Sequence, residues 1–419
     1  MSKNVIIIGG GIIGLSTAYY LQKEGCSVTV IDQTNMDGLT GGASYVNAGY
    51  LTPSHIISLA APGMITKGIK YMFNSTSPFY MKPRLDLDFL KWTWYFKKSA
   101  TKEKVEKAMT VIRDINLLSR DLYEEIHDSG DLGSFQLDKR GLLMLYKTDQ
   151  AGEAESAVAK IAQNLELESV FLNAEELKVL EPKVSPEVKG AIHYLCDFHT
   201  SPNEIMINMK SHLEKSGVVF QKNEKVVDFS FSNNKITEII TDKNTHKADE
   251  VILAAGSWSG FLSKKLNLKL PMEGGKGYRI NMEQETGINY PAILMEKKVA
   301  VTPMASFTRF AGTMEMSGLN HDINKKRVIA IANASEQYYE GLEIPQTDID
   351  NAQCGLRPVS PDGLPYIGRT AEFKNLTIGT GHAMMGWSLG PATGKLISEI
   401  IIDRKISMNI DSFNPQRKF

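Results

Sequence analysis

Residues 5–14 read VIIIGGGIIG, a short run of β-branched residues followed at once by glycines in the pattern G-x-G-x-x-G. The run at 5–8 is typical of a strand that is buried on both faces of a parallel sheet. Beyond the glycines, Ala18 and Leu21 fit one helix that stops at Gly25, and residues 28–31 fit a second strand. Because a strand–helix–strand crossover is right-handed, the glycine turn is expected at the carboxyl edge of the sheet, where ligands bind.

The three motif glycines each have a separate task in a dinucleotide site. Gly9 permits the tight turn, Gly11 lets the backbone approach a pyrophosphate, and Gly14 lets the helix pack on the strand. Free N–H groups at the helix start would face the phosphates, and Asp32 closes the second strand where an acid takes the ribose hydroxyls. We therefore predict a dinucleotide site. The competing interpretation is a glycine turn that only tightens packing, with Asp32 as a strand-end cap.

The glycine motif does not choose between NAD and FAD, and the deciding segment is GGASYVNAG at residues 41–49. Its small residues let a flat, wide group lie against the backbone. A flexible loop is the alternative interpretation, but the apolar neighbours Leu51 and Pro53 argue against it. The sequence therefore favours FAD.

Length, composition and charge limit the classes of protein to which this chain can belong. The 419 residues suffice for two or more packed cores, and a net charge of −1 argues against a broad nucleic-acid surface. The three cysteines have no C-x-x-C spacing and fit a reducing compartment. No secretory signal precedes the first strand, and no apolar run reaches the roughly 18 residues of a membrane span. We expect a cytoplasmic protein, with peripheral attachment to the inner face of the cell membrane left open.

The rest of the chain reads as helices and strands in mixed order. A segment rich in small and polar residues at 36–77 reads as a functional loop. The other expected elements, in chain order, are a long amphipathic helix over 105–126, a hairpin at 135–147, a helix at 205–213, a hairpin at 226–241, a buried strand at 251–256, a largely antiparallel β region at 277–345, a strand near 376–378 and a closing helix at 390–401.

With these residues in view, the chain resembles the small-subunit family of flavin-dependent D-amino acid dehydrogenases, within the wider group of D-amino acid oxidase, glycine oxidase and sarcosine oxidase. The similarity extends over nearly the whole chain. The segments that carry it are residues 9–14, 44–49, 60–63 (AAPG), 70–73 (KYMF), 90–94 (LKWTW), 276–278 (KGY), 355–363 (GLRPVSPDG) and 379–382 (GTGH).

The resemblance implies an α/β (α+β) two-domain fold that is discontinuous in sequence. A Rossmann-like FAD-binding domain is expected from residues 1–84, 187–262 and 346–419. A mixed, largely antiparallel β substrate domain that roofs the flavin is expected from residues 85–186 and 263–345.

The resemblance also implies where FAD lies. Residues 44–49 would lie beside the isoalloxazine, Val226 at the adenine, and residues 255–258 under the middle of the cofactor. Residues 381–388 would lie at the pyrimidine end, where donors and a helix start at Gly390 would stabilise charge on the reduced ring. For His382 a hydrogen-bonded loop histidine is the alternative. The expected cofactor-binding residues are Gly9, Gly11, Ile12, Ile13, Gly14, Asp32, Gln33, Ala43, Ser44, Asn47, Ala48, Gly49, Leu51, Val226, Ala255, Gly256, Trp258, Arg357, Gly381, His382, Gly386, Trp387 and Ser388.

Three residues are candidates for substrate chemistry. Arg357 resembles the carboxylate clamp of amino acid oxidases, and a guanidinium grips a carboxylate bidentately; a salt bridge between domains is the alternative. Tyr278 is a hydroxyl donor to the substrate or a core tyrosine. His199, with Asp197, departs from the more acidic segment of the bacterial dehydrogenases. It marks a different substrate, such as a cyclic imino acid, or only a turn capped by Asp197.

The function implied is FAD-dependent oxidative deamination of a small D-amino acid, with hydride passing from the α-carbon to flavin N5 and the imino acid hydrolysing to a 2-oxo acid. The enzyme alternatives act on a secondary or cyclic amine (D-proline, hydroxy-D-proline, sarcosine or glycine), and the non-enzyme alternative is a flavin-binding subunit of an electron-transfer complex. Expected partners are the amino acid and an electron acceptor, which is a quinone, a partner protein or oxygen. The aromatic residues at 92–96 read as a core patch or as a contact with a membrane or partner subunit. Cys354 is out of register with the covalent flavin tether of some sarcosine oxidases, so no covalent bond is expected, and no metal is expected.

Overall fold

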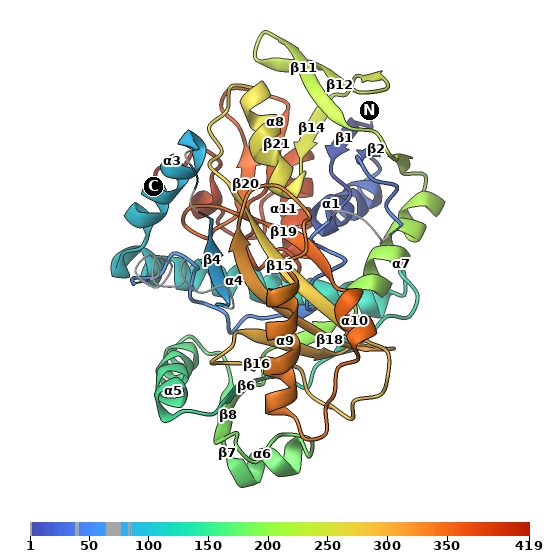
Figure 1. The fold of residues 1–419 in the computed structure, drawn as a ribbon. Coiled ribbons are helices and arrows are strands. Elements are labelled where there is room, and N and C mark those ends of the chain that lie inside the picture. The colour runs from blue at the N-terminus through green and yellow to red at the C-terminus, as the bar shows by residue number, and fades with distance from the viewer. Residues whose placement is uncertain (1, 38–41, 64–76, 83, 85) are drawn as a thin grey trace.

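A six-stranded sheet carries the glycine motif in the computed structural model, which describes residues 2–37, 42–63, 77–82, 84 and 86–419. The strand order is β10-β2-β1-β14-β21-β20, and only β20 runs antiparallel to its neighbour (Figure 1). The strands are β1 (Asn4–Ile8), β2 (Ser27–Ile31), β10 (Val219–Gln221), β14 (Glu250–Leu253), β20 (Tyr366–Arg369) and β21 (Leu376–Thr380). Strand β1 is buried from Val5 to its end, as the β-branched run predicts.

Helices α1 (Ile12–Lys23) and α11 (Gly390–Ile401) pack side by side beneath this sheet, although they come from opposite ends of the chain. Their backbones meet closely, because a side-chain carbon on Gly394 would lie 2.5 Å from the carbonyl carbon of Ser16. The long helix α4 (Lys102–Ser129) joins the same core through Ile112, Ile115 and Tyr123. Helices α7 (Pro202–Lys215) and α8 (Ser259–Lys265) complete this part, and the predicted closing helix is confirmed.

A second sheet of nine strands forms the other half of the molecule (Figure 1). Its order is β19-β15-β18-β17-β16-β6-β8-β7, with β4 paired to β18. The strands are β4 (Phe79–Met81), β6 (Leu142–Tyr146), β7 (Ser169–Asn173), β8 (Gly190–Tyr194), β15 (Glu273–Met282), β16 (Ala292–Leu294), β17 (Val299–Pro303), β18 (Thr308–Met316) and β19 (Gln353–Val359).

Two helices cover opposite faces of the nine-stranded sheet. Helix α9 (Lys325–Tyr338) shares a core with Leu143 and Leu145 of β6, whereas α5 (Asp149–Asn164) shares a core with Leu142 and Met144. Alternate residues of β6 therefore face different helices, as the two-residue period of a strand requires.

Smaller elements lie outside the two large sheets. A hairpin of β11 (Val226–Ser232) and β12 (Lys235–Thr241) turns through Asn233 and Asn234, both in the left-handed region, which confirms the predicted hairpin at 226–241. The remaining elements are β13 (Thr245–His246), the small sheet β3 (Tyr50–Leu51), β9 (Phe198–Thr200) and β5 (Leu137–Asp138), helices α3 (Leu87–Ser99), α6 (Ala174–Leu180) and α10 (Gln346–Asp350), and the 3-10 turns η1 (Gly256–Trp258) and η2 (Asp411–Phe413).

Two predicted elements are wrong. The hairpin expected at 135–147 does not form, because β5 pairs with β9 while β6 pairs with β8 and β16. Residues 142–145 are buried in succession, so they belong to the middle of a large sheet. Within the β region expected at 277–345, residues 325–338 form helix α9, which buries Val328, Ile331 and Ser335 at helical spacing.

The predicted two-domain α/β fold class is confirmed by the two sheets and their helices. The domain boundaries stay a proposal, and several elements do not lie in the part expected for them. Helix α4 packs in the core of the six-stranded sheet, while β4, β8 and β19 pair within the nine-stranded sheet. Within the part of the chain that the structure describes, no helix combines the length and apolarity needed to cross a bilayer.

Candidate active site

A cavity of about 930 Å³ is lined by residues from both large sheets. It takes in the glycine turn after β1, residues 42–48, the end of β14 and the loop before α11, together with β15, β18 and β19 of the nine-stranded sheet. Ligand cavities of this size at the junction of two domains are the usual place for catalysis. Most of the predicted site residues line it, and the exceptions are Gly14, Gly49, Leu51, Gly381 and His199.

The glycine turn fits a dinucleotide. A side-chain carbon on Gly14 would overlap the carbonyl oxygen of Gly9, and one on Gly9, where φ is +112°, would overlap that of Ala254. These two glycines therefore serve close packing of helix on strand and of turn on β14. Gly11 differs, because a side-chain carbon there would approach only the hydroxyl of Ser44, at 3.3 Å, from the cavity side. The backbone of Gly11 is therefore open where a phosphate group is predicted to bind.

Asp32 supports the turn and still has capacity for a ligand. One carboxylate oxygen accepts from the Gly10 amide at 2.7 Å, and the other accepts from the amide and hydroxyl of Thr34 at 2.8 and 2.7 Å. A carboxylate offers about four acceptor sites, so at least one stays open to a ribose hydroxyl. Asp32 and Gln33 both line the cavity.

A buried arginine holds residues 44–48 through hydrogen bonds to their backbone, and the sequence did not predict it. Arg309 on β18 is fully buried, and its Nη1 donates to the carbonyls of Tyr45 at 3.0 Å and Asn47 at 2.5 Å. Its Nε donates to the Asn281 side chain at 2.9 Å. Among the described residues no carboxylate pairs with Arg309, and burial, followed by the charge of Arg279, lowers its pKa. The guanidinium therefore holds the shape of the small-residue segment that was expected to carry the flavin.

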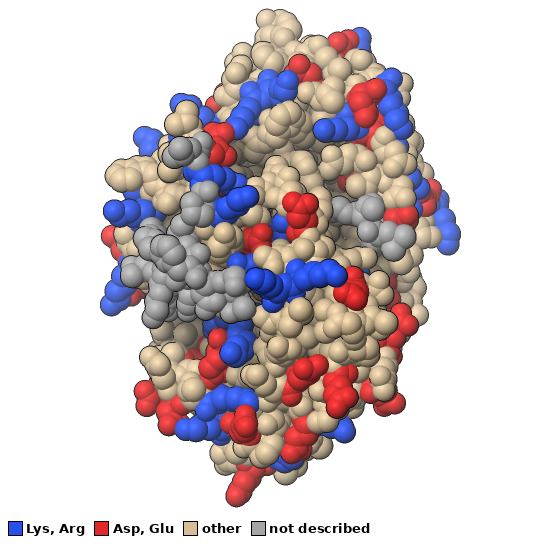
Figure 2. Space-filling model, in the orientation of Figure 1, with Lys and Arg blue, Asp and Glu red and all other residues tan. Residues whose placement is uncertain are grey.

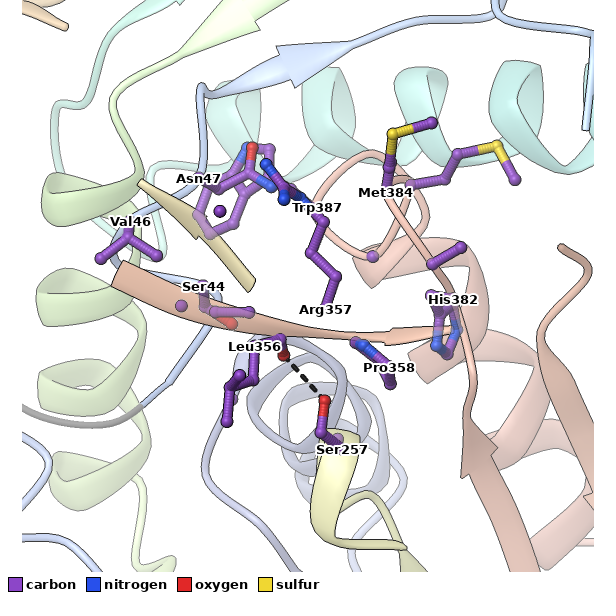
Figure 3. Close-up of a pocket in the computed structure, with 18 of the residues that line it drawn as sticks. Ser44, Val46, Asn47, Ser257, Leu356, Arg357, Pro358, His382, Met384 and Trp387 are labelled. Atoms are coloured by element: carbon purple, nitrogen blue, oxygen red, sulfur yellow. Dashed lines mark hydrogen bonds between the residues drawn. The ribbon is translucent and has the colours of Figure 1, made fainter. Parts of the chain in front are cut away.

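Arg357 projects from β19 into the cavity, toward the space lined by Asn47 and Trp387 (Figure 3). Its guanidinium lies over Gly277, where a side chain would overlap it, and Nη1 donates to the carbonyl of Thr313 at 2.8 Å. No described acidic side chain pairs with it, so the inter-domain salt bridge considered as the alternative is absent from the described residues. Burial lowers the pKa of Arg357 to about 10, so the group stays charged at neutral pH.

Tyr278 and His199 do not present their polar atoms to the cavity. Tyr278 is buried, and its hydroxyl donates to Glu315 at 2.9 Å, within a network that Arg327 and Lys276 complete. His199 lies outside the lining, with Nε2 3.0 Å from the carbonyl oxygen of Pro303, and burial lowers its pKa. His199 on β9 therefore lies outside the cavity where it was expected to act, and its catalytic role stays a prediction.

The loop before α11 is tied down by hydrogen bonds on several sides. The Trp387 indole donates to the Thr200 hydroxyl at 2.8 Å, and the Ser388 hydroxyl donates to Asn116 at 2.6 Å. His382 is buried with Nε2 3.0 Å from the Thr393 hydroxyl, and burial lowers its pKa to about 3, so the ring is neutral. The ring's partner on α11 agrees with the loop-histidine interpretation; its contact with a flavin stays a prediction.

Two further segments close the cavity. The Ser257 hydroxyl, in the turn η1 that follows β14, donates a hydrogen bond to the Leu356 carbonyl at 2.9 Å (Figure 3). This bond joins the part of the molecule with the six-stranded sheet to β19 of the nine-stranded sheet. Trp258 lines the cavity and stacks on His321 at 6.0 Å between ring centroids. Cys354 is buried with its thiol 3.4 Å from the His321 carbonyl and does not line the cavity, which fits the expectation of no covalent flavin bond.

The family model described as FAD dependent oxidoreductase (DAO) matches residues 4–400. A D-amino acid dehydrogenase of Helicobacter pylori is 30% identical over 413 residues, 98% of each chain, and one of Neisseria gonorrhoeae is 28% identical over 420 residues, 99% of each. Among solved structures, glycine oxidase from Geobacillus kaustophilus is similar in fold, with a TM-score of 0.79, 18% identity and coverage of 100% of this chain and 99% of that one.

Proposed function

The chain belongs to the DAO family of FAD-dependent oxidoreductases, and from this premise we propose that it catalyses the oxidative deamination of a small D-amino acid. It is an enzyme with FAD as its cofactor, and the cavity has the open glycine backbone and the flat small-residue wall that FAD needs. The observation that carries the proposal is Arg357, a charged guanidinium that faces the cavity without an acidic partner among the described residues. The full-length similarity to proteins named D-amino acid dehydrogenase supports the choice of substrate class.

The residues of the chain divide the work in the following way. Residues 9–13, Asp32 and Gln33 would hold the dinucleotide, and residues 43–48 with 386–388 would enclose the flavin ring. Bound FAD supplies the two-electron oxidant. Arg357 binds the substrate carboxylate and thereby orients the α-carbon, and Gly277 leaves room for the guanidinium that lies over it. Water then hydrolyses the imino acid to a 2-oxo acid and ammonia.

The alternative of a cyclic-amine substrate was based on His199 and Asp197, and neither residue lines the cavity. His199 lies outside the cavity lining, and the buried Asp197 accepts from the amide and hydroxyl of Ser54 at 3.0 and 2.5 Å. The segment at 197–202 therefore stabilises a loop. Secondary and cyclic amines still belong in the substrate panel, because the fold is shared with enzymes of several amines.

The decisive experiment is anaerobic reduction of the bound flavin by a panel of D-amino acids, L-amino acids and secondary amines. The reduction is measured as the loss of the flavin's yellow colour. We expect D-amino acids to bleach the wild-type protein. Arg357→Ala should raise KM on the order of 100-fold, because charge-assisted hydrogen bonds to the carboxylate are lost, while FAD stays bound. Arg279→Ala, on β15 outside the cavity lining, is the matched control. If no amine bleaches the flavin, the catalytic proposal fails.

We also propose that the protein is cytoplasmic and docks on the inner face of the cell membrane through α3. The outer face of this helix exposes Leu87 by 85%, Leu90 by 51% and Trp94 by 57%, beside the exposed Lys91, Lys97 and Lys98. Lysine and arginine are visible on this side of the molecule, on the left of Figure 2, with acidic residues among them. Apolar residues with lysine around them suit the headgroup region of an anionic bilayer. The inner face of α3 packs near Ala383, next to Met384 of the cavity lining, so a docked bilayer would lie beside the site.

Co-sedimentation with vesicles tests this docking. We expect binding to vesicles that contain phosphatidylglycerol and little binding to phosphatidylcholine alone, and a Leu87→Ser, Trp94→Ser variant should lose it. Binding that persists in this variant would contradict the role of α3.

We propose that the electron acceptor is a quinone, a partner protein or oxygen. Rapid mixing of the reduced protein with a soluble quinone or with oxygen tests two of these acceptors directly, and a partner protein is the acceptor that remains if neither reoxidises the flavin.

A further inference from the structure

Thr313 occupies a backbone position that is unusual for its side chain. It lies within β18 with φ of +71°, although it is β-branched and such residues avoid positive φ. Tyr278 pairs with Gly312 and Lys276 with Glu315, so the single residue Gly277 on β15 faces both Thr313 and Met314. This is a β-bulge, and its left-handed position normally belongs to glycine.

The bulge determines what Thr313 presents to the cavity. Gly312 faces α9, because a side-chain carbon there would lie 3.1 Å from Ile331. Met314 faces the opposite side, where its sulfur lies over Gly275, close to the position of Arg357 over Gly277. A bulge re-aims a side chain out of the regular alternation of its strand. Thr313 is partly exposed between buried neighbours and lines the cavity, so its hydroxyl belongs to the same wall as the guanidinium.

The two polar groups of Thr313 are used differently. Its carbonyl accepts from Nη1 of Arg357 at 2.8 Å and thereby holds the guanidinium in place. Its hydroxyl has no hydrogen-bond partner among the residues that the structure describes. Strained residues that the surrounding structure holds in place cluster at active sites and ligand-binding sites. Glycine would remove the strain and keep the carbonyl, so the feature that threonine adds is the hydroxyl.

We propose that the hydroxyl of Thr313 is a second contact for the substrate carboxylate, donating a hydrogen bond beside Arg357. This assignment rests on the proposed amino acid substrate and adds a binding residue to it. The carboxylate would be held by the guanidinium on one side and by the hydroxyl on the other, which fixes its rotation as well as its position. The α-carbon is thereby oriented by two groups that the bulge brings together.

Titration of the FAD-loaded protein with propionate tests the contact, because propionate has the carboxylate of an amino acid but no amine. Binding is read from the change in flavin absorbance, so turnover is not needed. Thr313→Val keeps the shape and removes the hydroxyl, and it should raise the propionate Kd by about tenfold or more, as loss of a hydrogen bond to a charged group predicts. Thr313→Ser should restore the affinity. Thr308→Val, at the start of β18 and outside the cavity lining, is the matched control.

A glycine variant keeps the test valid if valine disturbs folding. Thr313→Gly relieves the positive φ, so it should unfold at or above the temperature of Thr313→Val and still bind propionate about tenfold or more weakly. An unchanged propionate Kd in both variants would overturn the assignment, as would a loss of amino acid affinity without a loss of propionate affinity, which would assign the hydroxyl to the amine. If no amino acid bleaches the wild-type flavin, the proposed function fails, whereas the propionate titration still decides the carboxylate contact.

Discussion

At the scale of single residues, the cavity depends on charged groups that are buried without ionic partners. Arg309 is the clearest case, since its donors go to the carbonyls of Tyr45 and Asn47 and no described carboxylate neutralises it. A buried guanidinium is costly unless its hydrogen bonds are satisfied. Its position under residues 44–48 therefore indicates that a fixed shape of this segment matters to the protein.

Replacement of this arginine should uncouple the segment from β18. We expect Arg309→Met to leave the two carbonyls buried and unpaired, at about 1–3 kcal/mol each, so the free energy of unfolding falls and FAD binds more weakly. Equilibrium dialysis of FAD and thermal unfolding of the apo protein measure the two effects. Arg309→Lys should recover part of both, because one cationic donor remains. A methionine variant with unchanged FAD affinity would contradict this account.

Asp197 gives a pH dependence with a definite sign. Burial raises the pKa of this carboxyl from 3.8 to about 7, against the opposing hydrogen bonds from Ser54. Between about pH 4 and pH 7 the unfolded chain therefore releases a proton that the folded chain keeps, and stability falls as pH rises through this window. Relative to Asp197→Asn, wild type should lose up to about 1.4 kcal/mol per pH unit there. Denaturant unfolding of both proteins at several pH values measures it, and parallel curves would refute it.

Single residues also show where sequence reasoning works. Gly9, Gly14 and Asp32 follow from a local pattern in which each spacing has its own physical meaning, and the structure gives both glycines close backbone contacts. The chemistry of His199 predicts a place in the site, but the pairing of β9, which leaves no local pattern, holds this residue outside the cavity lining. Arg309 and Thr313 could not be found, because their importance comes from a register shift and from contacts with distant segments that leave no local pattern.

At the scale of elements, we expect Gly11 and Gly14 at the start of helix α1 to have different roles. Gly14 would serve stability as well as FAD binding, whereas Gly11 would serve FAD binding alone. Gly14→Ala would force α1 away from β1, so we expect loss of stability in the apo protein as well as loss of FAD. Gly11→Ala adds a methyl group where only the Ser44 hydroxyl is near, so the apo protein should keep its unfolding temperature while FAD affinity falls. Thermal unfolding without FAD separates the two variants. Equal destabilisation by both would contradict these assignments.

Elements were predicted where local sequence and tertiary structure agree. The hairpin over 226–241 carries its own turn residues, and α11 carries its own apolar period. The hairpin at 135–147 was wrong because β6 finds its partners, β8 and β16, far along the chain. Helix α9 was missed because its β-branched residues Val328, Ile329 and Ile331 are also typical of a strand, and the sheet it covers determines which face is buried.

At the scale of the whole molecule, the cavity proposed to hold FAD lies between the two halves, so we expect removal of the cofactor to loosen both. The cavity is lined by segments from residue 8 to residue 388, so the proposed site is complete only when they are assembled. Ligand that binds the folded state alone stabilises it by mass action, about 2.7 kcal/mol at a concentration 100 times Kd. We expect the unfolding temperature of the apo protein to rise with added FAD. Calorimetry over a range of FAD concentrations measures the rise, and a constant temperature would contradict it.

The contact between α1 and α11 has a consequence for how the protein is made. The first helix of the chain buries its face against one of the last, with Gly390 and Gly394 fitted to Ile12 and Ser16. Chains are synthesised from the amino terminus, so the glycine turn leaves the ribosome hundreds of residues before its packing partner. Until then α1 lacks the packing partner that Gly390 and Gly394 bring to it. We therefore expect capture of the cofactor to wait until α11 has been synthesised, and a chain cut short before residue 390 is expected to emerge without it.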